Sequence, residues 1–237
     1  MDTAPPGLLI VVPARAGSKG LPRKNLLRLG GMPLLAWTAR AIETAGLDAR
    51  AILSTEDAEI AEVGRAAGLE TPFVRPSSLA RDETPMADVV EHAVSWMERE
   101  GGYPVSAIML LQPTSPFRRA CRLREAVTML AEPGTDAVIG VDTIFRSPSL
   151  LFREDAAGIL QPLGPWEGRL LRQDIPPLLT PNGTIYLTSR DSFRRTRRLF
   201  PERLRGLSTS RVEAIDIDTP EDWELATAVV AAGLVKP

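Results

Sequence analysis

Short, predominantly apolar runs alternate along this chain with segments of helical periodicity, and this alternation constrains the fold more than any other feature. The apolar runs occupy residues 8–12, 51–53, 107–111, 136–141 and 184–187, with further candidates at 71–74 and 214–217. Helical spacing of apolar side chains marks residues 34–44, 60–67, 87–98, 118–131 and 220–232. Strands that are apolar along their whole length are buried on both faces, as in parallel sheets covered by helices. The order predicts a Rossmann-like, doubly wound, mostly parallel α/β sheet, whose ligands bind beyond the carboxyl ends of the strands.

One long segment interrupts this rhythm. Residues 143–180 contain five prolines and show no regular alternation of apolar and polar positions. A long irregular segment inside a compact α/β domain is usually functional. We therefore interpret 143–180 as an insertion within a single domain that spans residues 1–237.

Composition excludes several functional classes. The chain has one cysteine, Cys121, and one histidine, His92, which excludes a disulfide framework and metal sites built from several thiolates or imidazoles. Any metal would need oxygen ligands. The formal net charge of -2 argues against general binding to nucleic acid. The apolar stretch at 7–14 is too short to span a membrane and follows no cationic segment, so we expect a cytoplasmic protein with no membrane partner.

The loop after the first apolar run has the composition of a phosphate site. Residues 13–25 read Pro-Ala-Arg-Ala-Gly-Ser-Lys-Gly-Leu-Pro-Arg-Lys-Asn. Small residues let backbone N–H groups approach phosphate oxygens, while Arg15, Lys19 and Lys24 can neutralise a polyphosphate. The loop matches neither the Walker pattern nor the dinucleotide-binding glycine pattern. The structural alternative is a solvated turn with ordinary surface cations.

The distribution of lysines supports the phosphate interpretation. Of 28 basic residues, only Lys19, Lys24 and Lys236 are lysines. Codon bias explains the many arginines, but it does not explain why two of the lysines share one loop. An ammonium is a compact charge that suits phosphate oxygens, whereas a guanidinium is a wide planar fork.

A second constellation lies near the C-terminus, where residues 216–222 read Asp-Ile-Asp-Thr-Pro-Glu-Asp. In an extended segment Asp216 and Asp218 project to the same side and can bind one hard cation, for which Mg²⁺ is the natural candidate beside a triphosphate. Helix capping is the alternative, with Thr219 as N-cap and Asp222 at the capping-box position. Capping does not account for Asp216.

Together these motifs resemble those of the acylneuraminate cytidylyltransferases, also called CMP-sialic acid synthetases. The loop 13–25 is similar to the family's P-A-R-x-x-S-K-G-x-P-x-K-N signature. Further matching segments follow in the family's order, and they are Arg75-Pro76, Leu110 to Pro116, Pro181 to Tyr186 and Asp216 to Thr219. The similarity spans nearly the whole chain.

This resemblance implies a nucleotide-diphospho-sugar transferase type of fold, CTP as donor, Mg²⁺ as cofactor and an acidic nine-carbon 2-keto-3-deoxy sugar as acceptor. It also implies a homodimer in which the segment 143–180 is a dimerisation insertion. The implied substrate contacts are Arg15, Lys19, Lys24 and Asn25 at the triphosphate and ribose, Arg75 near the cytosine, Gln112, Asn182 and Tyr186 facing the sugar or ribose, and Arg172 at the sugar carboxylate. Asp216 and Asp218 would bind Mg²⁺.

The implied reaction is attack of the sugar's anomeric hydroxyl on the α-phosphorus of CTP, which gives a CMP-sugar and pyrophosphate. We expect Mg²⁺ and Lys19 to stabilise charge on the phosphoryl oxygens, and Lys24 and Arg15 to steady the pyrophosphate. The sequence shows no evident general base, and Asp216, directly or through metal-bound water, is a candidate for that role. The Ser-Lys-Gly and Gln-Pro-Thr-Ser-Pro stretches favour a sialic or legionaminic acid acceptor. The alternatives are a metal-dependent glycosyltransferase of similar fold, a cytidylyltransferase for another keto-deoxy sugar acid, and an inactive nucleotide-binding module.

Overall fold

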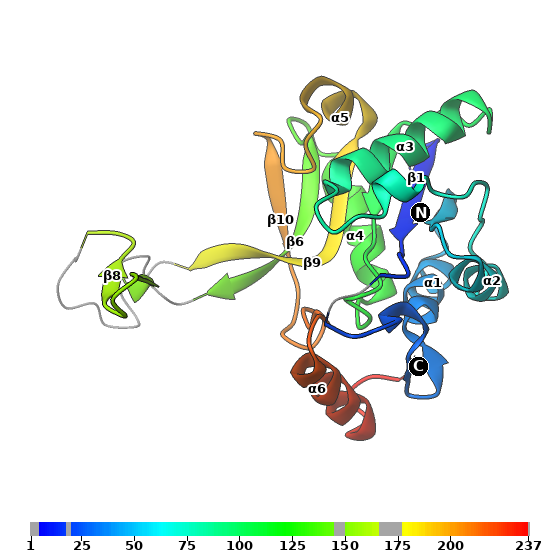
Figure 1. Ribbon diagram of the computed structural model, residues 1–237. Helices are drawn as coiled ribbons and strands as arrows, with labels where there is room; N and C mark the ends of the chain where they lie inside the picture. Colours follow the sequence, from blue (N-terminus) through cyan, green and yellow to red (C-terminus); the bar gives the residue numbers. More distant parts are fainter. Residues whose placement is uncertain (1–4, 18–19, 145–149, 166–176, 237) are drawn as a thin grey trace.

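The computed structural model describes residues 5–17, 20–144, 150–165 and 177–236 and contains a central six-stranded sheet (Figure 1). The strands, in spatial order, are β10 (Leu204–Ser208), β6 (Ala137–Ile144), β9 (Leu178–Ser189), β5 (Ala107–Leu110), β1 (Leu8–Pro13) and β4 (Ala49–Ser54). Strand β1 is parallel to β4 and β5, and β6 is parallel to β10. Strand β9 runs antiparallel between β5 and β6. The predicted mostly parallel α/β sheet is confirmed.

Helices cover both faces of this sheet because successive side chains of its strands point to opposite sides. Leu8, Ile10 and Val12 of β1 belong to a core cluster with α1 (Leu34–Ala45), α2 (Ala58–Ala66) and α4 (Ala120–Leu130). Leu9 and Val11 belong to a cluster on the other side with α3 (Met86–Arg99) and α5 (Arg190–Thr196). This is the two-sided burial that a continuous apolar run predicts.

Local sequence signals determine several helix ends. Helix α1 begins after Pro33 and ends at Gly46, which has a left-handed φ of 59°. Helix α6 (Pro220–Ala231) begins with the predicted capping box of Thr219 and Asp222. Asp57 caps α2, accepting a hydrogen bond from the backbone N–H of Ile60 at 2.9 Å.

Two expected strands are not strands of the sheet. Residues 71–74 form an irregular segment that follows an isolated bridge between Ile52 and Glu70. Residues 214–217 follow a turn, and Ile217 packs into a cluster with Leu29, Leu34 and Trp37 beneath α6. The apolar residues at 214–217 therefore pack in a separate cluster and not in the sheet. One edge of the sheet is formed instead by β10, which the sequence did not predict as a strand because arginines surround it.

The segment 143–180 contributes strands as well as irregular chain. Strands β6 and β9 continue pairing from Val141 with Pro181 to Ile144 with Leu178, and β7 (Phe152–Glu154) pairs with β8 (Leu160–Pro162) in a hairpin. Figure 1 shows these strands as an arm that projects away from the sheet and its helices. Large exposed apolar side chains gather there, and they are Leu150, Leu151, Phe152, Ile159, Leu160, Leu163 and Leu179.

Short elements complete the fold beside the loop 13–25. They are the 3-10 helices η1 (Lys24–Leu26) and η2 (Ser77–Leu79) and the small strands β2 (Arg28–Leu29) and β3 (Met32–Pro33). Among the described residues, no helix combines the length and apolar character that crossing a membrane requires.

Candidate active site

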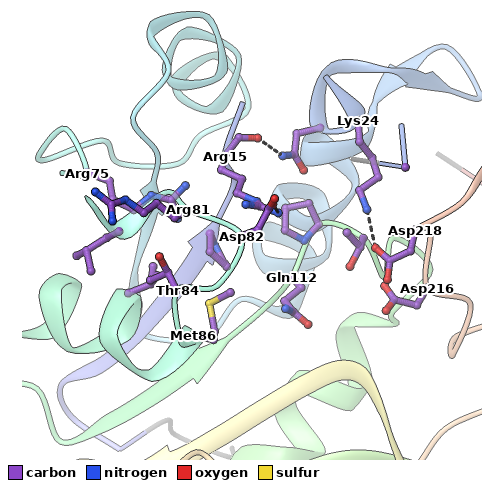
Figure 2. A pocket seen from close by; sticks show the side chains of 17 residues that line it. Arg15, Lys24, Arg75, Arg81, Asp82, Thr84, Met86, Gln112, Asp216 and Asp218 are labelled. Atoms are coloured by element: carbon purple, nitrogen blue, oxygen red, sulfur yellow. Dashed lines mark hydrogen bonds and ion pairs between the residues drawn. The ribbon is translucent and has the colours of Figure 1, made fainter. Parts of the chain in front are cut away.

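A cavity of about 420 Å³ lies beyond the carboxyl ends of β1 and β5, where an α/β sheet is expected to bind its ligand. Its lining comes from the loop after β1, the segment 75–89, residues 112–114 and the pair Asp216 and Asp218. Figure 2 shows Lys24 and the two aspartates at one end of the cavity and Arg75 with Arg81 at the other. Segments far apart in the sequence thus meet at one polar site.

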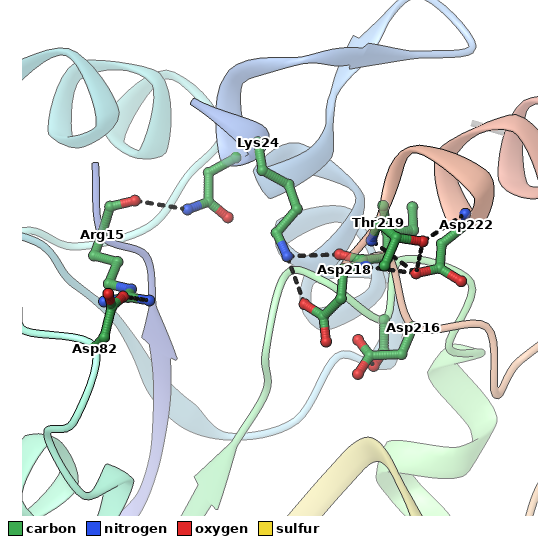
Figure 3. A network of polar contacts seen from close by, with 10 residues as sticks. Arg15, Lys24, Asp82, Asp216, Asp218, Thr219 and Asp222 are labelled. Atoms are coloured by element: carbon green, nitrogen blue, oxygen red, sulfur yellow. Dashed lines mark hydrogen bonds and ion pairs between the residues drawn. The ribbon is translucent and has the colours of Figure 1, made fainter. Parts of the chain in front are cut away.

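Lys24 and Asp218 form a direct ion pair at the acidic end (Figure 3). The Lys24 ammonium lies 2.7 Å from Asp218 Oδ1 and donates to the Ile217 carbonyl oxygen at 2.6 Å. The Lys24 side chain is 9% exposed, whereas that of Asp218 is 68% exposed. One carboxylate of the predicted metal pair is therefore already neutralised by a lysine of the phosphate loop.

Asp216 lies deeper than Asp218. Its Oδ1 accepts a hydrogen bond from the Ser115 hydroxyl at 3.4 Å, and the backbone N–H of Ile217 donates to the Thr114 carbonyl oxygen at 2.8 Å. Burial raises the pKa of the Asp216 carboxyl above its usual value, and the negative charge of Asp218 raises it further, against the opposing effect of Lys24. A divalent cation would relieve this repulsion.

Two glycines let backbone segments approach at the acidic end. A Cβ on Gly20 would lie 2.0 Å from the carbonyl oxygen of Asp218, so the phosphate loop can touch the acidic segment only without a side chain there. Gly183 has a φ of +78°, and a Cβ there would lie 3.1 Å from Ser115 Oγ and 3.6 Å from Asp216 Oδ2. The phosphate loop and β9 therefore both pack closely against the segment that carries Asp216 and Asp218.

Arg15 and Asn25 occupy the middle of the cavity lining. Arg15 Nη2 forms an ion pair with Asp82 Oδ1 at 2.5 Å, and Asn25 Nδ2 donates to the Arg15 carbonyl oxygen at 3.1 Å. Asn25 is buried and Arg15 is half-buried. The structure thus brings Arg15, Lys24 and Asn25 together, as the sequence predicts.

Arg75 also lines the cavity, from its opposite end. It is 3% exposed and pairs with Glu56 Oε2 through Nη2 at 2.7 Å. The neighbouring Arg81, Asp82 and Thr84 line the cavity too, although sequence reasoning did not select them. The charged and polar run at 81–84, which begins five residues after Pro76, was the available sequence signal.

Arg118 is a buried cation that sequence reasoning also missed. Its guanidinium donates to the carbonyl oxygens of Thr184 and Gln112 at 2.8 and 2.6 Å and to Thr38 Oγ1 at 2.7 Å. Burial lowers its pKa to about 9, partly offset by the charge of Asp216, so it remains protonated at neutral pH. Arg118 ties α1 and β9 to the segment that carries Gln112.

The three residues expected near the sugar or ribose are placed differently. Gln112 lines the cavity. Asn182 Nδ2 donates to Asp142 and Thr209 at 3.0 and 2.7 Å, while its Oδ1 accepts from the Thr184 hydroxyl at 2.8 Å, so its amide is engaged on the β6 side of β9.

Tyr186 is the third of these residues. Its ring contacts Phe200 edge to face, with ring centroids 5.6 Å apart. Burial raises the pKa of its phenol, and the charge of Asp216 raises it further. The phenol of Tyr186 therefore interacts electrostatically with the Asp216 carboxylate, although Tyr186 is not among the residues that line the cavity.

Two predicted site residues, Lys19 and Arg172, lie outside the described residues. Within the described part of the chain, no group of three or more His, Cys, Asp or Glu side chains could hold a metal ion. The pair Asp216 and Asp218 still suits Mg²⁺, which commonly takes one or two carboxylates and completes its shell with water and substrate phosphates.

Comparison with known proteins identifies the family. The profile described as cytidylyltransferase matches residues 9–166, which include the phosphate loop, Arg75 and Gln112. The chain belongs to the cytidylyltransferase family. This membership makes it a CTP-dependent nucleotidyltransferase, and the resemblance to acylneuraminate cytidylyltransferases is confirmed by relatives with those activities.

Among relatives of this cytidylyltransferase, CMP-N,N'-diacetyllegionaminic acid synthase of Legionella pneumophila is 33% identical over 221 residues, which cover 92% of this chain and 94% of the relative. N-acylneuraminate cytidylyltransferase of Streptococcus agalactiae serotype V is 29% identical over 218 residues, which cover 91% of this chain. The match covers 51% of that relative, so the chain spans about half its length.

Solved structures show the same fold at low sequence identity. CMP:2-keto-3-deoxy-manno-octonic acid synthetase complexed with CTP has a TM-score of 0.67 at 20% identity, over 96% of this chain and 99% of that one. A 4-diphosphocytidyl-2C-methyl-D-erythritol synthase from Anaerococcus prevotii has a TM-score of 0.64 at 13% identity, over 95% and 98% of the two chains. The expected fold class is confirmed.

Proposed function

We propose that this cytidylyltransferase transfers CMP from CTP to the anomeric hydroxyl of a sialic-acid-like 2-keto-3-deoxy nonulosonic acid and releases pyrophosphate. The observation that carries the proposal is the convergence of Arg15, Lys24, Asp216 and Asp218 on one cavity at the carboxyl end of the sheet. The named activities of the two relatives support the donor and the acceptor class. The Legionella relative favours a legionaminic acid, and the streptococcal relative favours N-acylneuraminate.

The protein's own contribution is to position the reactants and to stabilise charge. Lys24 and Arg15 bind the triphosphate, and Lys19 in the same loop offsets the negative charge that develops on the reacting phosphoryl group. Asp216, at the acidic end of the cavity, accepts the proton of the attacking hydroxyl. Gln112, which lines the cavity, faces the acceptor sugar or the ribose.

Asp216 and Asp218 are the residues that would hold Mg²⁺. A bound Mg²⁺ supplies positive charge next to the phosphoryl oxygens. A metal would compete with the Lys24 ammonium, which lies 2.7 Å from Asp218 Oδ1, for this oxygen. The residues therefore fit a metal whose binding weakens the ion pair between Lys24 and Asp218.

The projecting arm supports a homodimer as part of the same proposal. It concentrates exposed apolar side chains, including Ile159 and Leu160, which are each 59% exposed. A contiguous apolar surface on a projecting hairpin is a typical contact for another chain. We propose that the segment 143–180 contacts a second copy and brings Arg172 to the partner's site, where a guanidinium can pair bidentately with the sugar carboxylate.

A pyrophosphate-release assay tests the reaction. The protein is incubated with Mg²⁺, CTP and, one at a time, N-acetylneuraminic acid, a legionaminic acid, a pseudaminic acid and the eight-carbon KDO. We expect release with a nine-carbon acid, dependent on CTP and suppressed by a chelator. Transfer from a preformed nucleotide-sugar to an acceptor, without pyrophosphate release, would contradict the proposal and indicate a glycosyltransferase.

Mixed dimers test the shared site. Arg172→Ala subunits, which we expect to be impaired alone, are mixed with Lys19→Ala subunits, for which we expect the same, under conditions in which subunit exchange is confirmed. A site shared between subunits regains one intact copy in each heterodimer, so activity should return. A mixture that stays inactive would show that Arg172 serves its own chain.

A further inference from the structure

Glu56 connects two walls of the cavity although it does not line the cavity itself. It follows β4 by two residues. Its Oε1 accepts a hydrogen bond from the backbone N–H of Ala16 in the phosphate loop at 2.8 Å. Its Oε2 accepts one from Nη2 of Arg75 at 2.7 Å. One carboxylate thus holds both the loop after β1 and the guanidinium at the far end of the cavity.

Arg75 depends on this contact. It is 3% exposed, and its backbone N–H donates to the carbonyl oxygen of Thr55 at 2.8 Å, so residues 55 and 56 hold both its backbone and its side chain. Its Nε is buried with no hydrogen-bond partner among the described residues, which leaves this donor available. A buried guanidinium that loses its carboxylate partner becomes an uncompensated charge, which is strongly unfavourable.

Ala16, in the phosphate loop, is the second residue that Glu56 contacts. It lies between Arg15, which lines the cavity and pairs with Asp82, and Gly17. Because Glu56 accepts the hydrogen bond from the N–H of Ala16, it fixes the backbone next to Arg15 from a position outside the cavity lining. Figure 2 shows Arg15 between Arg75 and Lys24, so this turn lies between the two ends of the site.

We propose that Glu56 is a positioning residue that sets the phosphate loop and Arg75 at a fixed separation, so that one nucleotide contacts both together. The proposal rests on the proposed function, because it takes CTP as the occupant of the cavity. A carboxylate is required because both of its oxygens accept. A glutamine would turn its NH₂ group toward either Ala16 N–H or Arg75. An aspartate is one methylene shorter, so we expect it to lose one of the two contacts unless the backbone shifts.

Calorimetric titration with two probes tests this role. CTP reports on both walls, and inorganic tripolyphosphate reports on the phosphate loop alone. We expect Glu56→Gln and Glu56→Asp to weaken CTP binding by about tenfold or more, in line with the loss of a charge-assisted hydrogen bond, and to weaken tripolyphosphate binding as well. In an Arg75→Ala background, the added effect of Glu56→Gln on CTP should be smaller, because the two residues act together.

Glu98→Gln is the matched control. Glu98, near the end of α3, also accepts through both of its carboxylate oxygens, from Nε and Nη2 of Arg190 at 2.8 and 2.9 Å, and neither residue lines the cavity. Its replacement should lower the melting temperature while CTP binding stays unchanged. The proposal is overturned if the Glu56 variants bind both probes as tightly as the wild type, or if their effect on CTP is as large with Arg75→Ala as without it.

Hydrogen exchange separates this inference from the proposed function. Glu56→Ala removes both acceptor oxygens, so it should speed exchange of the Ala16 amide in the protein without any ligand. If the wild type fails to bind CTP while this exchange accelerates, the proposed function fails and the positioning role stands. Unchanged exchange at Ala16 would overturn the positioning role.

Discussion

The ammonium of Lys24 lies 2.7 Å from Asp218 Oδ1, so a cation of the phosphate loop is bound to a carboxylate expected to hold Mg²⁺. The two residues are 194 positions apart in the chain. Their contact joins the phosphate and metal parts of the site, so a phosphate that binds Lys24 or a metal that binds this oxygen of Asp218 competes with the ion pair.

Replacing Lys24 should separate metal binding from nucleotide binding. In Lys24→Met, Asp216 and Asp218 lose their positive neighbour, so Mn²⁺ binding without CTP should become tighter. CTP binding should weaken by roughly 10- to 100-fold, because a hydrogen bond from a charged group is lost. Titration with Mn²⁺ and with CTP measures the two effects, and exposed Lys236→Met is the control. Weaker Mn²⁺ binding in Lys24→Met would contradict this account.

Removing either acidic charge should impair turnover much more than folding. We expect Asp216→Asn and Asp218→Asn to lower the rate of pyrophosphate release by about 10²-fold or more, as for the loss of a major electrostatic stabiliser. The control is Asp222→Asn in the same segment, since its amide oxygen can still accept from the N–H of Thr219. Near-normal rates and metal dependence in both aspartate variants would refute the metal assignment.

The raised pKa of Asp216 predicts a gain in stability when the charge is removed. A carboxyl whose pKa is higher in the folded state than in the unfolded state loses stability as pH rises through the folded pKa. At pH 7 without metal, Asp216→Asn should therefore melt at a higher temperature than the wild type. The difference should shrink at acid pH, where the wild-type carboxyl is protonated. A lower melting temperature for the variant at pH 7 would be the contrary result.

The close approach at Gly20 predicts a position-specific effect within the phosphate loop. Gly20→Ala places a Cβ 2.0 Å from the backbone oxygen of Asp218, and backbone must shift to relieve it. Overpacking of this kind typically costs about 1–3 kcal/mol. At Gly17 an added Cβ meets no atom of the described residues within 4 Å, so Gly17→Ala should leave the melting temperature nearly unchanged. Equal melting temperatures for the two variants would show that the loop does not pack on the acidic segment.

The exposed arm predicts a change in association without a change in fold. Leu160→Asp replaces a side chain that is already 59% exposed, so the subunit should remain folded. Sedimentation velocity should show a dimer for the wild type and a monomer for the variant. Leu225→Asp on α6, at a position that is 53% exposed and outside the arm, should sediment like the wild type. A Leu160→Asp dimer of wild-type stability would exclude this surface from the interface.

Local sequence determined the elements whose signals lie within a few residues of one another. The continuous apolar run at 8–12 predicted β1 because both faces of that strand are buried. Thr219 and Asp222 predicted the start of α6 because a capping box needs only residues three positions apart. The phosphate loop was predicted for the same reason, since its glycines and cations are contiguous.

Contacts between distant segments were decided by the tertiary structure. Ile215 and Ile217 alternate like a strand, but the position of α6 directs them into a separate cluster, whereas β10 joins the sheet despite Arg205 and the arginines that precede it. Only the fold places Arg81 in the cavity lining and brings Arg118 to the carbonyl oxygen of Gln112, next to the cavity. Charge and hydrogen-bonding capacity are properties of a residue, whereas burial and partner depend on where the rest of the chain lies.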